Sequence, residues 1–238
     1  MSNAISLTVV VAAFTMLTPG HAIAGQDPSA PITKAAAIEK LGPNLYRLDK
    51  VRVDTASREV TVSGKINPNV STLEFVANTK DGWRAYESAV TLDTDAITFN
   101  AALILIGLDP AHAKGSPKAH FDPAAVDGDA VTVSLECPGG ECQRMPAERL
   151  MFDNTRKETV SGGKWVYTGS SFLPDGHYLA DIGAVIIGFV HDPGDIIEYS
   201  VGAGLGNYGQ IVTNPNLGLG AGTTIKITVK AATPPSSH

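Results

Sequence analysis

Glycine and proline interrupt this chain so often that long regular elements have little room to form. The 238 residues include 24 Gly and 15 Pro, a share above the average of roughly 12% that favours turns and short strands. Between them lie short segments of alternating apolar and polar residues, such as 59–62 and 223–229, which are typical of half-buried strands. Segment 97–106 is apolar on nearly every helical face, which predicts a buried helix. We therefore expect an α+β fold, a single strand-rich domain with one buried helix at about 95–107 and short peripheral helices.

The expected buried helix has clear start and stop signals. Thr94 or Asp95 can cap its first amides. Gly107 can end it, and Pro110 prevents its continuation. Asn100 is its strongly polar interior position, and burying an unpaired amide costs roughly 1–3 kcal/mol. We expect Asn100 to have a hydrogen-bond partner or to face an opening.

Two other local patterns predict secondary structure. Residues 35–41 favour a short helix that ends at Gly42-Pro43. The dipeptide Asp81-Gly82 separates the strand-like segments 73–77 and 83–88. Because Asp-Gly is a preferred two-residue turn, this arrangement predicts a β-hairpin.

The first residues have the pattern of an export signal. Residues 4–18 form an apolar run that is too short to cross about 30 Å of hydrocarbon comfortably. The small residues Ala22 and Ala24 then suit cleavage after position 24, with an uncleaved membrane anchor as the alternative. We expect a soluble periplasmic or secreted protein with no membrane span after cleavage. The expected organisation is a signal peptide at 1–24, a leader and short helix at 25–39, one domain at 40–230 and a disordered tail at 231–238.

Cys137 and Cys142 are the only two cysteines, and Pro-Gly-Gly follows the first of them. Strand-like segments flank the pair, so we interpret it as a hairpin loop closed by a disulfide, which suits an oxidising compartment. A redox pair or half of a metal site are the alternatives. An iron–sulfur cluster needs about four thiolates, which this chain lacks.

Charge limits the classes of partner. The chain has 18 Lys and Arg against 24 Asp and Glu, a formal net charge of −6. Because phosphate binding needs a basic surface, nucleic acid is an unfavourable partner. We expect an unknown small molecule or a cell-envelope protein as the partner.

No motif indicates a cofactor or a metal. Residues 204–209 match G-x-G-x-x-G, but the β-branched residues and Pro215 that follow prevent the helix on which a dinucleotide phosphate would sit. Asp122, Asp127 and Asp129 lack the spacing and the closing Glu of a calcium loop. We expect no cofactor and no metal.

Catalytic candidates are weak. A periplasmic hydrolase would have to use a Ser/His/Asp constellation drawn from Ser170, His177, Asp181 and His191. These residues match no hydrolase motif in its required context, so catalysis is the second hypothesis.

Several short segments occur in an order that resembles the YdjY-domain family of exported bacterial proteins. The segments are Val51-Arg52-Val53-Asp54, Glu59-Val60-Thr61-Val62, Leu73-Glu74-Phe75, Tyr86-Glu87-Ser88, residues 101–108, Met145-Pro146-Ala147-Glu148 and residues 165–170. The resemblance covers about residues 40–230 and implies a YdjY-like domain there, without assigning a reaction.

Our leading hypothesis is an exported soluble binding or accessory domain of unknown ligand that is not an enzyme. A cleft in which Glu87, Ser88 and Asn100 meet would be its ligand-binding site. Their polar side chains lie in segments that are otherwise apolar or strand-like.

Overall fold

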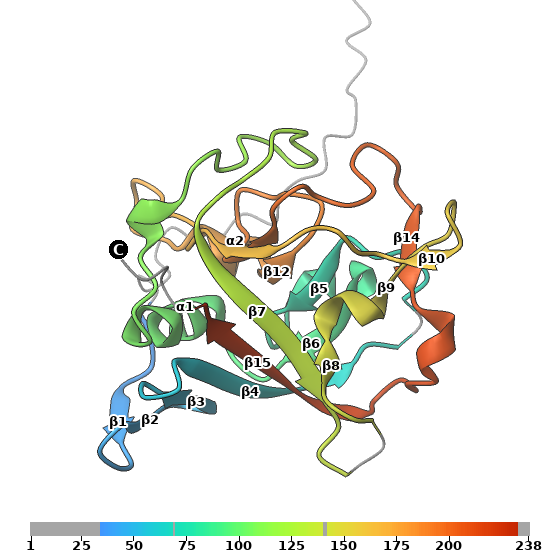
Figure 1. Ribbon diagram of the computed structural model, residues 1–238. Coiled ribbons are helices and arrows are strands. Elements are labelled where there is room, and N and C mark those ends of the chain that lie inside the picture. Colours follow the sequence, from blue (N-terminus) through green and yellow to red (C-terminus); the bar gives the residue numbers. More distant parts are fainter. Residues whose placement is uncertain (1–33, 69, 140–141, 233–238) are drawn as a thin grey trace, which may run out of the picture. The chain divides into compact units, whose positions relative to one another are not determined.

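The computed structural model in Figure 1 describes residues 34–68, 70–139 and 142–232. These residues lie within one compact unit that spans 32–238. The expected signal peptide, most of the expected leader and residues 233–238 of the expected tail fall outside the described residues. Within the described ranges, no helix combines the length and the apolar character that a membrane crossing requires.

Strands make up most of the regular structure. The larger sheet contains β1 (Ile38–Lys40), β2 (Leu45–Leu48), β3 (Val51–Asp54), β4 (Glu59–Ile66), β5 (Phe75–Asn78), β6 (Ser88–Leu92), β7 (Asp129–Glu136), β8 (Met145–Pro146), β11 (Trp165–Tyr167), β12 (Val185–Gly188), β13 (Ile197–Tyr199) and β15 (Thr224–Ala231). The smaller sheet contains β9 (Met151–Asp153), β10 (Glu158–Thr159) and β14 (Ile211–Thr213). The helical elements are α1 (Ala96–Leu105), α2 (Leu179–Gly183) and the 3-10 turns Trp83–Glu87, Pro110–His112, Ala147–Leu150 and Pro215–Leu217.

The larger sheet closes on itself. Eight strands pair in the order β4-β15-β7-β11-β13-β12-β5-β6, and β6 pairs with β4 to complete a closed barrel. The eight residues of β4 make this possible, because the first half of the strand pairs with β3 and the second half with β6. The expected α+β class is therefore wrong, and the fold is mostly β. The short peripheral helices that we expected are represented mainly by 3-10 turns.

Alternating burial explains the barrel wall. In β15, Ile225, Ile227 and Val229 are fully buried, whereas the residues between them are more polar. Ile227 pairs with Val62 on β4 and with Leu135 on β7, both of which are also buried. Because side chains of a strand point to alternate faces, these residues place one apolar layer in the core.

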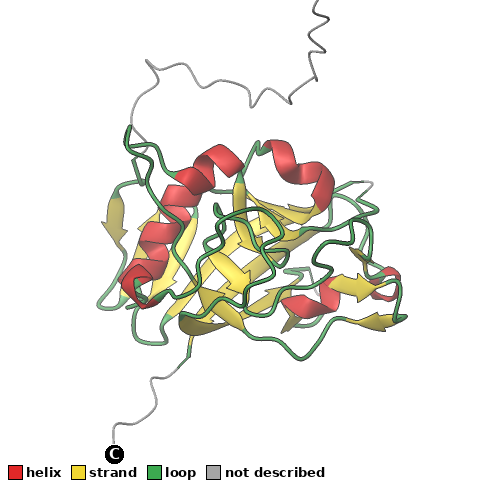
Figure 2. Ribbon diagram, turned by 90° about the horizontal axis from the view of Figure 1, so that it is seen from above, coloured by secondary structure: helices red, strands yellow, loops and turns green. Residues whose placement is uncertain are grey.

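The buried helix is confirmed as α1, which packs against β3, β12 and α2. The side chain of Asp95 accepts a hydrogen bond from the amide of Thr98 at 2.7 Å and so caps the helix. Asn100 has the partner that we expected, since its Oδ1 accepts a hydrogen bond from the hydroxyl of Tyr167 at 2.7 Å. Figure 2 shows the helices lying around the central strands.

Two local predictions are wrong. Residues 38–40 form β1 and not a helix, because they pair with β2 in the register Ile38 to Leu48. The expected hairpin at Asp81-Gly82 is absent, since β5 and β6 run parallel and the turn Trp83–Glu87 connects them. The indole of Trp83 donates to the carbonyl of Ile182, a distant contact that turn chemistry cannot reveal.

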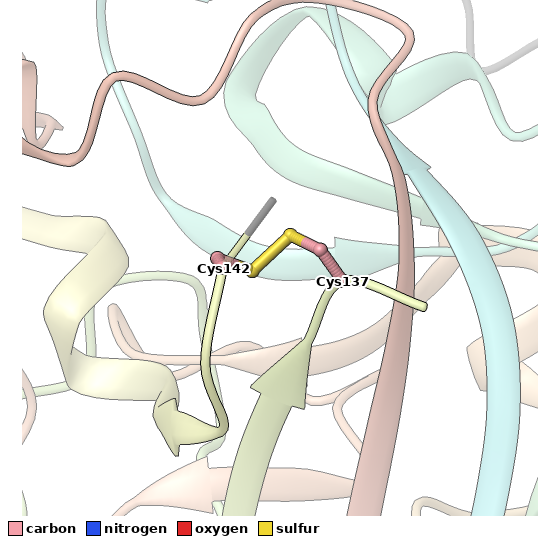
Figure 3. The surroundings of a disulfide bond; sticks show 2 residues. All are labelled: Cys137 and Cys142. Atoms are coloured by element: carbon pink, nitrogen blue, oxygen red, sulfur yellow. A yellow bond between two sulfur atoms is a disulfide. The ribbon is translucent and has the colours of Figure 1, made fainter. Parts of the chain in front are cut away.

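The cysteine hairpin is confirmed. Cys137 and Cys142 form a disulfide with a Cα–Cα distance of 5.0 Å, shown in Figure 3. It closes the connection between β7 and β8, which are antiparallel with Leu135 opposite Met145.

Candidate ligand-binding site

A long loop covers part of the barrel wall. We call residues 107–128 the cover loop; it connects α1 to β7. The amide of Phe121 donates to the carbonyl of His191, and the amide of Val126 donates to the carbonyl of Ser200. These two hydrogen bonds connect the cover loop to the residues before and after β13.

The face of β13 beneath this loop carries an acidic residue. Ile197 and Tyr199 pack into the apolar core. Glu198 lies between them and therefore points to the opposite face of the sheet. Gly188 of β12 is its partner across the parallel pair. Glu198 is nevertheless only 1% exposed, because other parts of the chain cover this face.

A cavity of about 100 Å³ lies at this place. Its polar lining residues are Ser116 from the cover loop, Thr168, Ser170 and Ser171 from the segment after β11, and Asp195 and Glu198. Two prolines complete the lining. The polar side chains among the lining residues therefore carry hydroxyl and carboxyl groups.

Three of the four carboxyl oxygens of Asp195 and Glu198 are buried without a hydrogen-bond partner among the described residues. Both oxygens of Asp195, Oε2 of Glu198 and Oγ of Ser170 are buried and unpartnered among the described residues. Burial, together with the charges of Asp192 and Glu198, raises the pKa of Asp195 well above its usual range. Burial also raises the pKa of Glu198 to about 8. Such costly, unpaired acids are typical of functional sites.

The positively charged side chains next to the cavity form ion pairs with other acidic residues. His120 of the cover loop contacts Glu74 through Nε2 and Asp192 through Nδ1, each at 2.9 Å. Burial lowers the pKa of His120, but the hydrogen bonds to Asp192 and Glu74 outweigh it and raise the pKa to about 9. Arg84 donates to Glu87 at 3.2 Å and to Asp192 at 3.3 Å. At neutral pH, one continuous row of charges thus links the cover loop to Glu74, which directly precedes β5, and to the β12–β13 connection.

None of these ion pairs includes Asp195 or Glu198. Arg84 also stacks on the ring of Phe75, with its guanidinium carbon 4.9 Å from the ring centroid. In the described part of the chain, no Lys, Arg or His nitrogen lies within salt-bridge distance of Asp195 or Glu198. The positive charge of Arg84 lowers the pKa of Asp195, but burial and the charges of Asp192 and Glu198 outweigh it.

Larger hollows lack this combination. In a hollow of about 280 Å³, the buried acid is Asp153, which accepts hydrogen bonds from two backbone amides and from Gln210. A second hollow of about 450 Å³ beside β7 has side chains of both charges, Arg144, Lys164 and Glu148. We therefore consider the smaller cavity the better candidate.

The expected ligand-binding residues are divided between two places. Glu87 pairs with Arg84, and the hydroxyl of Ser88 donates to the carbonyl of the same arginine at 2.9 Å. Asn100 lies on α1 and bonds to Tyr167. In the described residues no hydrogen bond joins Asn100 to the other two, so a site shared by all three stays a prediction.

The hydrolase candidates do not contact one another through hydrogen bonds. Ser170 lines the cavity, whereas Nδ1 of His177 contacts Asp175 at 3.1 Å. Asp181 accepts a hydrogen bond from the amide of Ala96 at 2.7 Å, and burial raises its pKa to about 6. Ser170, His177 and Asp181 thus have different neighbours and lie in different parts of the fold.

His191 is occupied by the backbone. Its Nδ1 lies 2.9 Å from the carbonyl oxygen of Asp122, and its Nε2 lies 2.9 Å from the carbonyl oxygen of Tyr199. The residue is fully buried. With both ring nitrogens facing carbonyl oxygens, the side chain has no nitrogen left to accept a proton from a serine.

Sequence reasoning singled out Ser170 but missed Asp195 and Glu198. The available signal was two acids in an otherwise apolar segment, with Ile196 and Ile197 between them. An acidic residue between core residues of a strand can face solvent or can be covered by another part of the chain. Here the position of the cover loop determines which of the two occurs.

The family model of the YdjY domain matches residues 51–186, more than half of the chain. The chain belongs to the YdjY family. The YdjY domain match begins at β3, ends within β12 and includes the cover loop and Ser170, whereas Asp195 and Glu198 follow it. The chain matches no curated protein and no solved structure.

Proposed function

We propose that this chain is an exported, soluble, non-catalytic domain that binds a small cationic ligand in the cavity beneath the cover loop. The observation that carries this proposal is the pair of buried acids, Asp195 and Glu198, which line a polar cavity and have carboxyl oxygens without hydrogen-bond partners among the described residues. A buried carboxylate without a partner is unfavourable, and a bound cation would remove the penalty.

The size of the cavity supports binding of a small ligand. Sites for drug-sized molecules occupy about 300–1,000 Å³, whereas this cavity occupies about 100 Å³. A metal ion with a few waters, or a small ammonium ion, is the class of ligand that such a volume accepts.

Export is supported by two independent features. Residues 4–18 have the length and apolar character of a signal sequence, and small residues precede the expected cleavage position after Ala24. The disulfide between Cys137 and Cys142 is of the kind that persists in oxidising compartments such as the periplasm.

Thermal unfolding of the purified protein tests the proposal. The probes are magnesium chloride, calcium chloride, methylammonium chloride and sodium acetate, compared at constant ionic strength. At least one cation should raise the midpoint temperature of the wild type, acetate should not, and the double variant Asp195→Asn/Glu198→Gln should lose the response.

Asp153→Asn is the matched control, because Asp153 is also a buried acid but has hydrogen-bond partners for both oxygens. This variant should keep the wild-type response to cations. The proposal would be wrong if no cation stabilised the wild type, or if the double variant responded as strongly.

A further inference from the structure

Building on the proposed function, we propose that the ligand is a hard divalent cation of the magnesium or calcium type. Asp195 and Glu198 would bind it through their free carboxyl oxygens, with the hydroxyl of Ser170 as a further ligand. The sequence motifs predicted no metal site, because these three residues form no spaced motif.

The chemistry of the lining favours such an ion. All of the side-chain donor atoms come from serine, threonine, aspartate and glutamate, and they are all oxygens. Oxygen-only sites suit magnesium and calcium, whereas histidine and cysteine, which favour zinc and copper, are not among the lining residues. The lining also lacks an aromatic ring, the usual partner of an organic ammonium ion.

The charge of the site matches two positive charges. Asp195 and Glu198 supply a formal charge of −2 when both are ionised. Arg84 is committed to Glu87 and Asp192, and His120 is committed to Glu74 and Asp192. A monovalent ion would balance only one of the two carboxylates, whereas a divalent ion balances both.

The number of protein ligands indicates an ion that keeps bound water. Four oxygens are free, two on Asp195, one on Glu198 and one on Ser170. Within the described ranges, no group of three or more His, Cys, Asp or Glu residues is arranged around a metal position. Magnesium is commonly bound by one or two carboxylates while retaining several waters, so a site with two acids fits this type of ion.

Ser170 is held in an uncommon backbone conformation next to the cavity. Its φ angle is 53°, in the left-handed region, and the preceding Gly169 also has a positive φ of 79°. Serine adopts this region rarely, and such residues cluster at ligand sites. The turn thus places a serine, and not another glycine, among the residues that line the cavity.

Isothermal titration calorimetry of the metal-free protein distinguishes the proposed binding of a cation from the narrower proposal that the cation is divalent. Magnesium and calcium should bind the wild type, and methylammonium should not. Asp195→Asn and Glu198→Gln should each weaken divalent binding at least 10-fold, because each removes a charged ligand. Ser170→Ala should weaken it less, by about 2–10-fold, since a neutral ligand is lost.

The unliganded variants also serve as their own folding control. Asp195 has no hydrogen-bond partner to lose, so Asp195→Asn without metal should unfold at the wild-type temperature or above it. Asp153→Asn should keep wild-type metal affinity. Binding of methylammonium alone, abolished in Asp195→Asn, would overturn the divalent assignment and leave the proposed cation-binding function standing. Absence of binding for every cation would overturn both, and wild-type metal affinity in Asp195→Asn would place any metal elsewhere.

Discussion

Gly188 lies so close to Asp195 that no side chain fits between them. A Cβ atom added to Gly188 would overlap the carboxyl group of Asp195, far inside van der Waals contact. The missing side chain in β12 is therefore what allows the buried carboxyl to occupy its position. It also fixes that position, because the backbone of a central strand cannot move away.

Replacing this glycine should destabilise the fold. Gly188→Ala forces either the strand or Asp195 to shift, and overpacking of this kind costs about 1–3 kcal/mol of unfolding free energy. Urea unfolding measures the change. In the control Gly220→Ala, the added Cβ has its nearest neighbour at 3.9 Å, so its unfolding free energy should stay within about 0.5 kcal/mol of the wild type. Equal stability of Gly188→Ala and wild type would contradict this packing.

The row of charges through His120 makes stability depend on pH. Its pKa is about 9 in the folded protein, above the ordinary value of 6.5. The stabilisation is therefore complete below about pH 6.5 and is lost as the pH rises through 9. His120→Gln should remove about 1–2 kcal/mol at pH 6.5 and almost nothing at pH 10, with the magnitude reduced because the side chain is 32% exposed.

Urea unfolding of wild type and His120→Gln between pH 6 and 10 measures this difference. Subtraction cancels the titration of other groups, including Glu198, to the extent that the substitution leaves them unchanged. His112→Gln is the control. Hydrogen bonding to Asp129 also raises the pKa of His112, but the side chain is exposed, so this substitution should have a smaller pH-dependent effect on stability. A difference that was constant across the pH range would contradict the role of His120.

The hydrogen bond between Tyr167 and Asn100 should stabilise the contact between α1 and β11. Both residues are buried, so removal of one partner leaves the other unsatisfied at a cost of about 1–3 kcal/mol. In a double-mutant cycle of Tyr167→Phe and Asn100→Ala, the losses should be non-additive by at least 0.5 kcal/mol. Additive losses would show that the bond contributes little.

The disulfide should contribute modestly. Closing a ring of the six residues from Cys137 to Cys142 stabilises the fold by about 2 kcal/mol in the chain-entropy model. Cys137→Ser/Cys142→Ser should lower the unfolding free energy by that amount and make it insensitive to reductant. A disulfide in the folded protein would be contradicted if the unfolding free energy of the wild type were also insensitive to reductant and both thiols could be alkylated.

Local signals in the sequence were sufficient for part of the local structure. Asp95 and Gly107 bracket the apolar run that forms α1, and Pro-Gly-Gly marks the hairpin between β7 and β8. These predictions succeeded because capping and turn formation depend on residues that are adjacent in the chain.

The closed barrel could not be predicted in the same way. Its closure depends on the pairing of Gly64 with Leu92 between β4 and β6, and on the insertion of β15 between β4 and β7. Alternation of apolar and polar residues identifies a strand but does not show which other strand it pairs with. The same limitation explains residues 38–40, where pairing with β2 overrides a local preference for helix.

The candidate site was predictable only in part. Ser170 stood out as a polar candidate, but the histidines and Asp181 that accompanied it lie in other networks. Asp195 and Glu198 became candidates only when the structure showed that they are covered and unpartnered. Burial of a charged side chain is a property of the assembled chain.

The most direct measurement is the diffraction of crystals grown with manganese, a magnesium substitute that scatters anomalously. An anomalous peak should lie about 2.0–2.6 Å from carboxyl oxygens of both Asp195 and Glu198, the range for hard cations. It should disappear in Asp195→Asn crystals. A wild-type map at saturating manganese without a peak in this cavity, or with its peaks elsewhere, would contradict the account.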